Sequence, residues 1–262
     1  MRRILLGIVA IGVLSAPPAL ATDMAVKAPP PVPAPAPIFS WTGFYIGGNA
    51  GGAWERESNS LVVTNNLFFA AGAIPGINAS GSQTLHSSGF SGGGQVGYNY
   101  QSGNVVWGIE LDFESLSQGA SGGGPFAYTT NGVIYQLTTN SSTNWLFTAR
   151  PRLGWAIDRN LLYVTGGVAV VHRRFTQNFL DIGGGPETAS FSKAQAGWTV
   201  GAGYEYAVTN NWTLRAEYLF AGFDAVTASG LEGPAGGTST LNNSSKLDVQ
   251  IVRGGLNYKF GG

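Results

Sequence analysis

Residues 90–116 read FSGGGQVGYNYQSGNVVWGIELDFESL, and this stretch decides the fold class. Within 105–116, the odd positions up to 113 carry bulky apolar side chains, whereas the even positions include Glu110, Asp112 and Glu114. Successive side chains of a strand point to opposite faces, so this period of two predicts a strand with one apolar and one polar face. Residues 90–101 alternate in the same way, and the polar segment 101–104 between the two runs predicts a turn.

Working outward from this hairpin, the same alternation occurs in six more runs. The eight predicted strands cover 44–54, 90–101, 105–116, 143–155, 162–171, 194–206, 212–220 and 250–260. Short turns at 101–104, 157–160 and 207–211 alternate with long polar segments at 55–89, 117–142, 172–193 and 221–247. This order predicts an all-β fold, an eight-stranded antiparallel up-and-down barrel with short turns at one end and long loops at the other.

The polar face of the runs indicates which way the barrel is turned. That face carries mostly Gly, Ser, Thr, Gln and Asn, and charged residues make up only 11% of the chain. A soluble ligand-binding barrel would turn its apolar face inward and carry many charges outside. We therefore predict a transmembrane barrel with its apolar face in lipid, since each run has about the 9–11 residues that a tilted crossing needs.

The N-terminal region predicts export across the cytoplasmic membrane. Arg2 and Arg3 precede the apolar run 4–14, and Ala19-Leu20-Ala21 offers a small-x-small cleavage pattern. These features predict a signal peptide over 1–21, cleaved after Ala21. The Pro-rich residues 22–40 predict an extended periplasmic linker, which leaves 41–262 for the barrel.

The composition argues against several other functions. The formal net charge is +0 and no basic run is present, so nucleic acid is not an expected partner. Without cysteine there is no disulfide, thiolate metal site or cysteine nucleophile. His86 and His172 fall at the outer ends of strands with no metal-ligand or catalytic spacing, and the GGGP motifs lack a following Lys-Ser/Thr. We expect neither an enzyme nor a cofactor.

Tyrosine and tryptophan cluster beside the short turns, on the apolar face of the runs. This position predicts an aromatic girdle at the periplasmic membrane surface. The predicted girdle consists of Tyr98, Tyr100, Trp155, Tyr204, Tyr206, Trp212 and Tyr258.

Ten charged side chains are predicted to point into the lumen. They are Glu110, Asp112, Glu114, Arg150, Arg152, Glu205, Arg215, Glu217, Arg253 and Lys259. Because isolated charges in a narrow barrel are costly to desolvate, we expect Glu110 and Asp112 to pair with Arg150 and Arg152. An eight-stranded barrel encloses little more than its own side chains, which favours a static plug over a polar gate or narrow conduction path. Glycines on the inner face are expected to make room for these long side chains.

Four phrases in this order resemble a known family. They are WTGFYIGGNAGGAW at 41–54, GGGQVGYNYQ at 92–101, TARPRLGWAIDRNLLYVTGG at 148–167 and VRGGLNYKF at 252–260. The chain from 41 to 260, without its loops, is similar to the small outer-membrane barrels of alphaproteobacteria. These are the outer-membrane immunogenic and porin-family proteins, related to OmpA-like and opacity-type barrels.

The resemblance implies an eight-stranded barrel in the outer membrane of a Gram-negative cell, surrounded by lipid and lipopolysaccharide. It also implies insertion by the barrel-assembly machinery, which recognises a C-terminal aromatic residue. Phe260 matches that residue, but Gly261 and Gly262 follow it, which departs from the family pattern. The expected function is that of a structural, surface-exposed barrel of the surface-antigen type.

Two alternative functions remain open at this stage. The barrel could be a small-solute porin with a narrow channel. Alternatively, the long loops could bind a host factor, a phage or haem through apolar patches such as 67–69 and 126–128.

Overall fold

The computed structural model describes residues 39–64, 68–128, 130–181, 185–232 and 239–260. Its elements are β1 (Gly43–Thr64), α1 (Ile74–Gly81), β2 (Thr84–Ser102), β3 (Val105–Ala127), β4 (Ile134–Ile157), β5 (Asn160–Asp181), β6 (Gly185–Ala207), β7 (Trp212–Glu232) and β8 (Ser239–Lys259). Each strand pairs antiparallel with its neighbours in sequence, and β1 pairs with β8 to close the ring. The predicted eight-stranded up-and-down barrel is therefore confirmed. The signal peptide, its cleavage after Ala21 and all of the linker before Phe39 lie outside the described residues.

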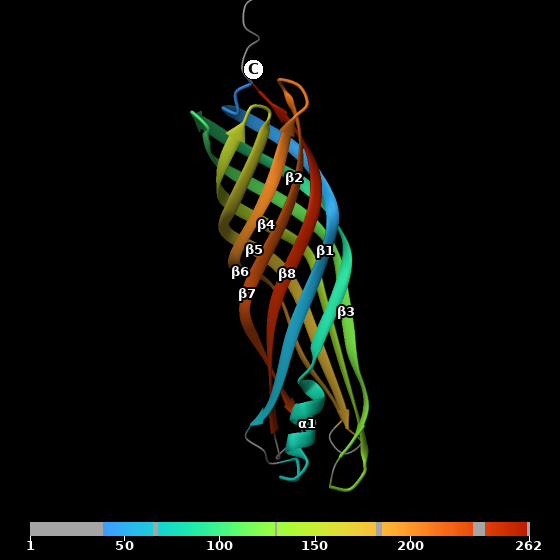
Figure 1. Cartoon of the computed structure of the whole chain (residues 1–262). Helices are drawn as coiled ribbons and strands as arrows, with labels where there is room; N and C mark the ends of the chain where they lie inside the picture. Colours follow the sequence, from blue (N-terminus) through green and yellow to red (C-terminus); the bar gives the residue numbers. More distant parts are fainter. Residues whose placement is uncertain (1–38, 65–67, 129, 182–184, 233–238, 261–262) are drawn as a thin grey trace, which may run out of the picture. The chain divides into compact units, whose positions relative to one another are not determined.

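Short turns join the strands at one end of the barrel, where β8 also ends (Figure 1). In the β2–β3 and β4–β5 turns the chain reverses through a residue with positive φ, Gly103 at 60° and Asp158 at 52°. Glycine and short polar residues adopt this left-handed conformation most readily. The local sequence thus explains where the chain turns back.

At the other end, most residues of the segments predicted as long polar loops belong to strands instead, although the connection from β1 to β2, which contains α1, remains long. The strands are 19–24 residues long, and they extend through most of the segments expected to be loops. In β1, for example, Leu61 and Val63 are buried inside the barrel, while Ser58 and Ser60 face outward. The alternation continues there with small polar residues on the outer face, so it no longer resembles the pattern of a membrane-crossing strand.

Helix α1 lies at this far end and contacts β1 and β3 (Figure 1). Its Ile77 is fully buried, and Gly81 packs so closely on Leu61 that a Cβ atom at Gly81 would overlap that side chain. Over the described part of the chain, no helix is long and apolar enough to cross a membrane. Helix α1 instead helps to fill the far end of the barrel.

Three apolar clusters are stacked inside the barrel. The layer at the short-turn end, which is the top of Figure 1, is called the lower layer because that end is the periplasmic one, and it contains Phe39, Trp41, Val106, Ala156, Leu161, Tyr163 and Ala207. The middle layer contains Ala53, Leu116, Leu146, Ala169, Val171, Leu219, Ala221, Phe223, Leu247, Val249 and Ile251. The upper core contains Leu61, Val63, Phe69, Ala73, Ile77, Tyr128, Tyr135, Leu137, Phe179 and Leu241.

Candidate functional site

Between the lower and middle apolar layers lies a network of charged side chains. The parity of β3, β4, β6, β7 and β8 turns all ten predicted lumen charges inward, where each is at most 5% exposed, and nine of them form this network. They are Glu110, Asp112, Glu114, Arg150, Arg152, Glu205, Arg215, Glu217 and Arg253. At the centre, one guanidinium nitrogen of Arg150 lies 2.7 Å from Glu110 and 2.7 Å from Asp112.

The pairing also crosses the lumen. Arg215 on β7 lies 2.6 Å from Glu110 on β3 and 2.6 Å from Glu217 on its own strand. Arg253 on β8 lies 2.5 Å from Glu217 and 3.0 Å from Asp112, and it also contacts Glu114. These contacts connect strands on opposite sides of the ring, so they fill the lumen at this level rather than line it.

Two tyrosines complete the centre of the network. The hydroxyl of Tyr45 donates to Glu110 at 2.7 Å, and the hydroxyl of Tyr163 donates to Glu217 at 3.0 Å. The guanidinium of Arg152 stacks on the ring of Tyr163, 3.9 Å from its centroid. A Cβ atom at Gly97 or Gly203 would lie 2.4 Å from Tyr45 or Tyr163, respectively. Only glycine therefore leaves room for these rings.

Hydrogen bonds extend the network to every strand. Arg152 lies 2.8 Å from Glu205, and Asn257 donates to the same carboxylate at 2.9 Å. Gln95 on β2 donates to Asn257 at 2.7 Å. Sequence reasoning did not assign Tyr45, Tyr163, Gln95 or Asn257 to the network, although their parity places each on the inner face.

The tenth predicted charge, Lys259, lies nearer the short-turn end. Its ammonium group donates to the carbonyl of Ser40 at 2.6 Å and lies 4.9 Å from the ring centroid of Phe39. Phe39 packs edge-on against Trp41, which is 1% exposed. Phe39 and Ser40, the last residues of the expected linker, thus contact the barrel and close its lower mouth.

A second polar layer, between the middle layer and the upper core, was not predicted. Glu57 lies 3.2 Å from Arg173, and Glu55 accepts hydrogen bonds from Thr143 at 3.1 Å and Ser87 at 3.3 Å. Glu55 follows Trp54, where the exposed apolar belt of β1 ends, and its burial raises the pKa of its carboxyl to about 7. Extending the parity of β1 and β5 beyond the predicted strands would have identified this layer.

The predicted apolar patches in the long segments belong to the upper core. Phe69 and Tyr128 are each 8% exposed, and Phe69 packs against Phe179 with ring centroids 5.7 Å apart. Phe68 and Phe126 pack against the same cluster while partly exposed. Phe69 and Tyr128 therefore do not form a free patch for a partner, because they pack into the upper core, whereas Phe68 and Phe126 remain partly exposed.

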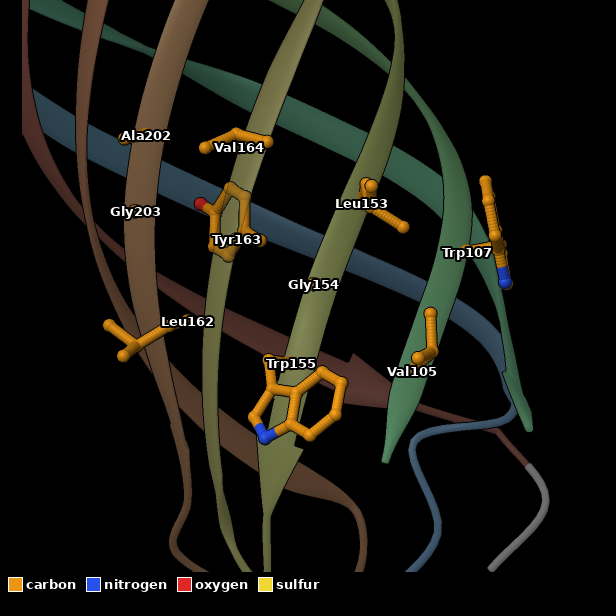
Figure 2. A pocket seen from close by; sticks show the side chains of 10 residues that line it. All are labelled: Val105, Trp107, Leu153, Gly154, Trp155, Leu162, Tyr163, Val164, Ala202 and Gly203. Carbon is orange, nitrogen blue, oxygen red and sulfur yellow. The ribbon is translucent and has the colours of Figure 1, made fainter. Parts of the chain in front are cut away.

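The outer face of the lower half carries a belt of exposed apolar side chains. All seven residues of the predicted girdle face outward near the short turns. An apolar groove on this face crosses β3, β4, β5 and β6, and Figure 2 shows Trp155 close to the short-turn end of β4 and Trp107 on β3. At the other margin of the belt lie Trp54, Trp145 and Trp198, which sequence reasoning did not recognise as a second aromatic row.

The two histidines are not brought into a reactive arrangement. His172 stacks on Trp145 on the outer face, with ring centroids 5.9 Å apart, and His86 lies exposed on β2. No group of three His, Cys, Asp or Glu side chains able to hold a metal ion occurs in the described ranges. The buried polar site is thus an ion-pair network.

Comparisons with known proteins agree with this architecture. A family model described as "Outer membrane protein beta-barrel domain" matches residues 7–260. The chain is 38% identical to a 31 kDa outer-membrane immunogenic protein of Brucella melitensis over 95% of this chain and 97% of that protein. It is 31% identical to a 22 kDa outer membrane protein of Rhizobium leguminosarum over 72% of this chain and 67% of that protein.

Among solved structures, Neisserial surface protein A is 15% identical with a TM-score of 0.36, covering 84% of this chain and 98% of that chain. The family match and the Brucella similarity both extend over nearly the whole chain. The chain therefore belongs to the outer membrane β-barrel family, and it is an outer-membrane protein related to the outer-membrane immunogenic proteins.

Proposed function

We propose that this protein is a structural, surface-exposed barrel whose lumen is closed by its own side chains. The observation that carries the proposal is the ion-pair network, in which Arg150, Arg215 and Arg253 join carboxylates from opposite walls. Apolar layers lie on both sides of this network. An ion crossing the lumen would have to break buried charge pairs and then pass two dry layers, both of which are costly.

Single-channel recording in planar bilayers tests the closed lumen directly. We expect the purified wild-type protein to give silence or rare small flickers. The alternative is a small-solute porin, which requires the ion pairs to open. Stable, large conductance steps that change in Arg152→Gln or Glu110→Gln would overturn the closed lumen and support the porin.

The outer surface supports a membrane-anchoring role for the aromatic residues. Tyrosine and tryptophan favour the membrane–water interface because their rings have an apolar body and a polar edge. In our proposal, the girdle from Tyr98 to Tyr258 marks the periplasmic surface, and Trp54, Trp145 and Trp198 mark the extracellular one. Lipid surrounds the belt between these two rows.

Biogenesis in this proposal begins with removal of residues 1–21 after Ala21, and residues 22–40 then lead into the barrel. Phe260 is the aromatic residue that the barrel-assembly machinery would recognise. Its amide donates to the carbonyl of Phe44 at 2.8 Å, which places it at the β1–β8 closure of the ring. Phe260→Ala should lower the amount of barrel inserted in cells, while refolding of the purified variant in detergent stays unchanged.

The extracellular half is the part of the protein that antibodies or partners would meet. Its relatives named as immunogenic proteins support a surface-antigen role. We propose no catalytic turnover, because the carboxylates of the network pair with its arginines and neither histidine faces the network. Hydrolysis of a general ester or peptide substrate by the purified barrel, abolished by His86→Ala or His172→Ala, would contradict this part of the proposal.

A further inference from the structure

A cavity lies at the extracellular end of the barrel, beside the start of helix α1. Its volume is about 250 Å³, and it is lined by residues of the β1–α1 connection, of the β3–β4 turn and by the last residue of β5. These segments are distant in sequence and meet only in the folded ring. The cavity is separate from the ion-pair network of the lumen and from the apolar belt on the outer face.

The floor of this cavity is buried, whereas its rim is exposed. Phe69, Tyr128 and Asp181 at the floor are each 8% exposed. At the rim, Thr130 and Asn131 are exposed to water. The cavity thus connects buried aromatic rings and one carboxylate with the extracellular solvent, which is the usual composition of a small-ligand site.

The β3–β4 turn holds its side of the cavity in place. The amide of Gly132 donates to the carbonyl of Tyr128 at 2.9 Å, and the amide of Tyr128 donates to the carbonyl of Val133 at 2.9 Å. Gly132 has a φ of 71°, which glycine adopts without strain. The ring of Tyr128 also stacks on Tyr135, with ring centroids 4.6 Å apart. This wall of the cavity is therefore preformed, which lowers the entropy cost of binding.

Asp181 is the one charged residue among the described residues that line the cavity. In the described ranges it forms no ion pair and no side-chain hydrogen bond. The next inward cation on its strand, Arg173, lies about 25 Å farther along β5 and pairs with Glu57. Glu187, which faces inward on β6 opposite Phe179, adds a second negative charge. Because a buried carboxylate without a cation is costly, the cavity favours a positively charged ligand.

We propose that this cavity binds a quaternary ammonium head group of the choline type. Asp181 is the counter-ion of the head group, and the side chains of Phe68, Phe69 and Tyr128 provide aromatic surface around it. A cation is attracted to the face of an aromatic ring, and the attraction is larger where water is excluded. This inference goes beyond the proposed function, since a closed lumen does not require a ligand at the extracellular end.

The size and chemistry of the cavity favour this head group over other cations. Sites for drug-sized ligands have volumes of roughly 300–1,000 Å³, so the smaller cavity favours a compact group. A primary ammonium carries three N–H donors, and each needs an acceptor when it is buried. A trimethylammonium group has no donor, and it requires only a negative charge and apolar or aromatic contacts, which the floor supplies.

The test uses the folded full barrel in a maltoside detergent, which has no ammonium group of its own. Ligand-observed NMR measures binding of choline, and we expect saturation with a Kd of about 1 mM or lower. Dimethylbutanol, the neutral carbon analogue of choline, should bind at least about tenfold more weakly, because it has no charge to pair with Asp181. As a second measurement, choline should slow proteolysis of the extracellular half.

Matched variants separate the charge from the aromatic surface. D181N should bind choline at least about tenfold more weakly, whereas D248N, which removes an acid from the outer face of the same half, should bind like the wild type. F68L removes a ring and should lose about two- to fivefold in affinity, whereas F68Y keeps the ring and the affinity. Heat-modifiable gel mobility verifies that each variant is folded, and the Phe68 variants provide the measurement if D181N does not fold.

Four results would overturn the proposal. They are no saturation up to about 10 mM choline, equal affinity for choline and dimethylbutanol, tighter binding of butylamine than of choline, and unchanged affinity in folded D181N. Glycerophosphocholine distinguishes two sources of the same head group, since tighter binding than choline indicates a lipid and weaker binding indicates a free solute. The same samples should stay silent in planar bilayers with choline present, which keeps this test separate from that of the closed lumen.

Discussion

The membrane half and the extracellular half of this barrel are built from the same eight strands but have opposite polarity. In the membrane half of β1, Tyr45 and Asn49 point into the lumen, while Phe44 and Ile46 face outward and are 64% and 53% exposed. Farther along the same strand, Leu61 and Val63 point inward and serines face outward. The difference shows that the surrounding solvent, lipid or water, selects which face is apolar, while the strand geometry stays constant.

The two halves also use different interactions inside. On the short-turn side of the middle apolar layer, buried arginines and carboxylates form ion pairs in which one group contacts several partners at once. Above it, aromatic and aliphatic side chains pack as they do in a soluble protein, with helix α1 covering one side. We therefore expect the membrane half to be sensitive to loss of a charge and the extracellular half to loss of volume.

The largest effect is expected from Arg253→Met. This change leaves Glu217, Asp112 and Glu114 without a shared cation in a buried site, which typically costs about 3–5 kcal/mol. Urea-induced unfolding from lipid vesicles measures the free energy of unfolding. Arg159→Met, in the periplasmic turn, is the control and should change it little. A loss below about 1 kcal/mol for Arg253→Met would mean that the membrane half does not depend on its charges.

A smaller, local effect is expected from Leu137→Ala in the upper core. Leu137 is fully buried, so the cavity should weaken packing of the extracellular half by about 2–4 kcal/mol. We expect faster proteolysis of that half, with heat-modifiable mobility of the whole barrel unchanged. Leu180→Ala, at an outward position that is 48% exposed, should have little effect. Loss of the entire barrel in Leu137→Ala would show that the halves are not separable.

A double-mutant cycle isolates one pair of the membrane half. Glu110→Gln and Arg150→Met should each lower the free energy of unfolding. The double variant should lose about 2 kcal/mol less than the sum of the two single losses, and this difference is the coupling energy of the pair. Urea unfolding of the four proteins gives that coupling. The same cycle between Glu110 and Arg159 provides the baseline, and a coupling for Glu110–Arg150 no larger than this baseline would exclude a direct interaction.

The smallest effect concerns pH and the second polar layer. Burial raises the pKa of Glu55 from 4.5 to about 7, so the folded barrel holds this proton more tightly than the unfolded chain does. The extracellular half should therefore lose stability as pH rises from about 4.5 to about 7. Hydrogen exchange of β1 and β2 at pH 5 and pH 8 measures the change, and Glu55→Gln should remove it. An equal pH dependence in Glu55→Gln would assign the effect to another group.

Sequence reasoning was most accurate where lipid imposes a strict pattern. Bulky apolar residues must alternate with polar ones in a membrane-crossing strand, so residues 105–116 or 143–155 predict both the strand and its facing. The ten predicted charges were found the same way, and nine of them join the described ion pairs. In the extracellular half the outer face contacts water, so small polar residues suffice there. Strands with Gly, Ser, Thr and Asn on that face therefore resemble loops in their composition.

By itself, the sequence determined the number of strands, their order, the short turns and which side chains enter the lumen of the membrane half. These properties are local, since they follow from the period of two and from residues that favour turns. Only the tertiary structure decided which charges meet across the lumen, how far the strands extend and what the apolar residues of the long segments contact. Arg253 contacts Asp112, and Phe69 contacts Phe179, because the closed ring brings segments that are distant in sequence together. A local sequence pattern does not specify which distant residues will meet.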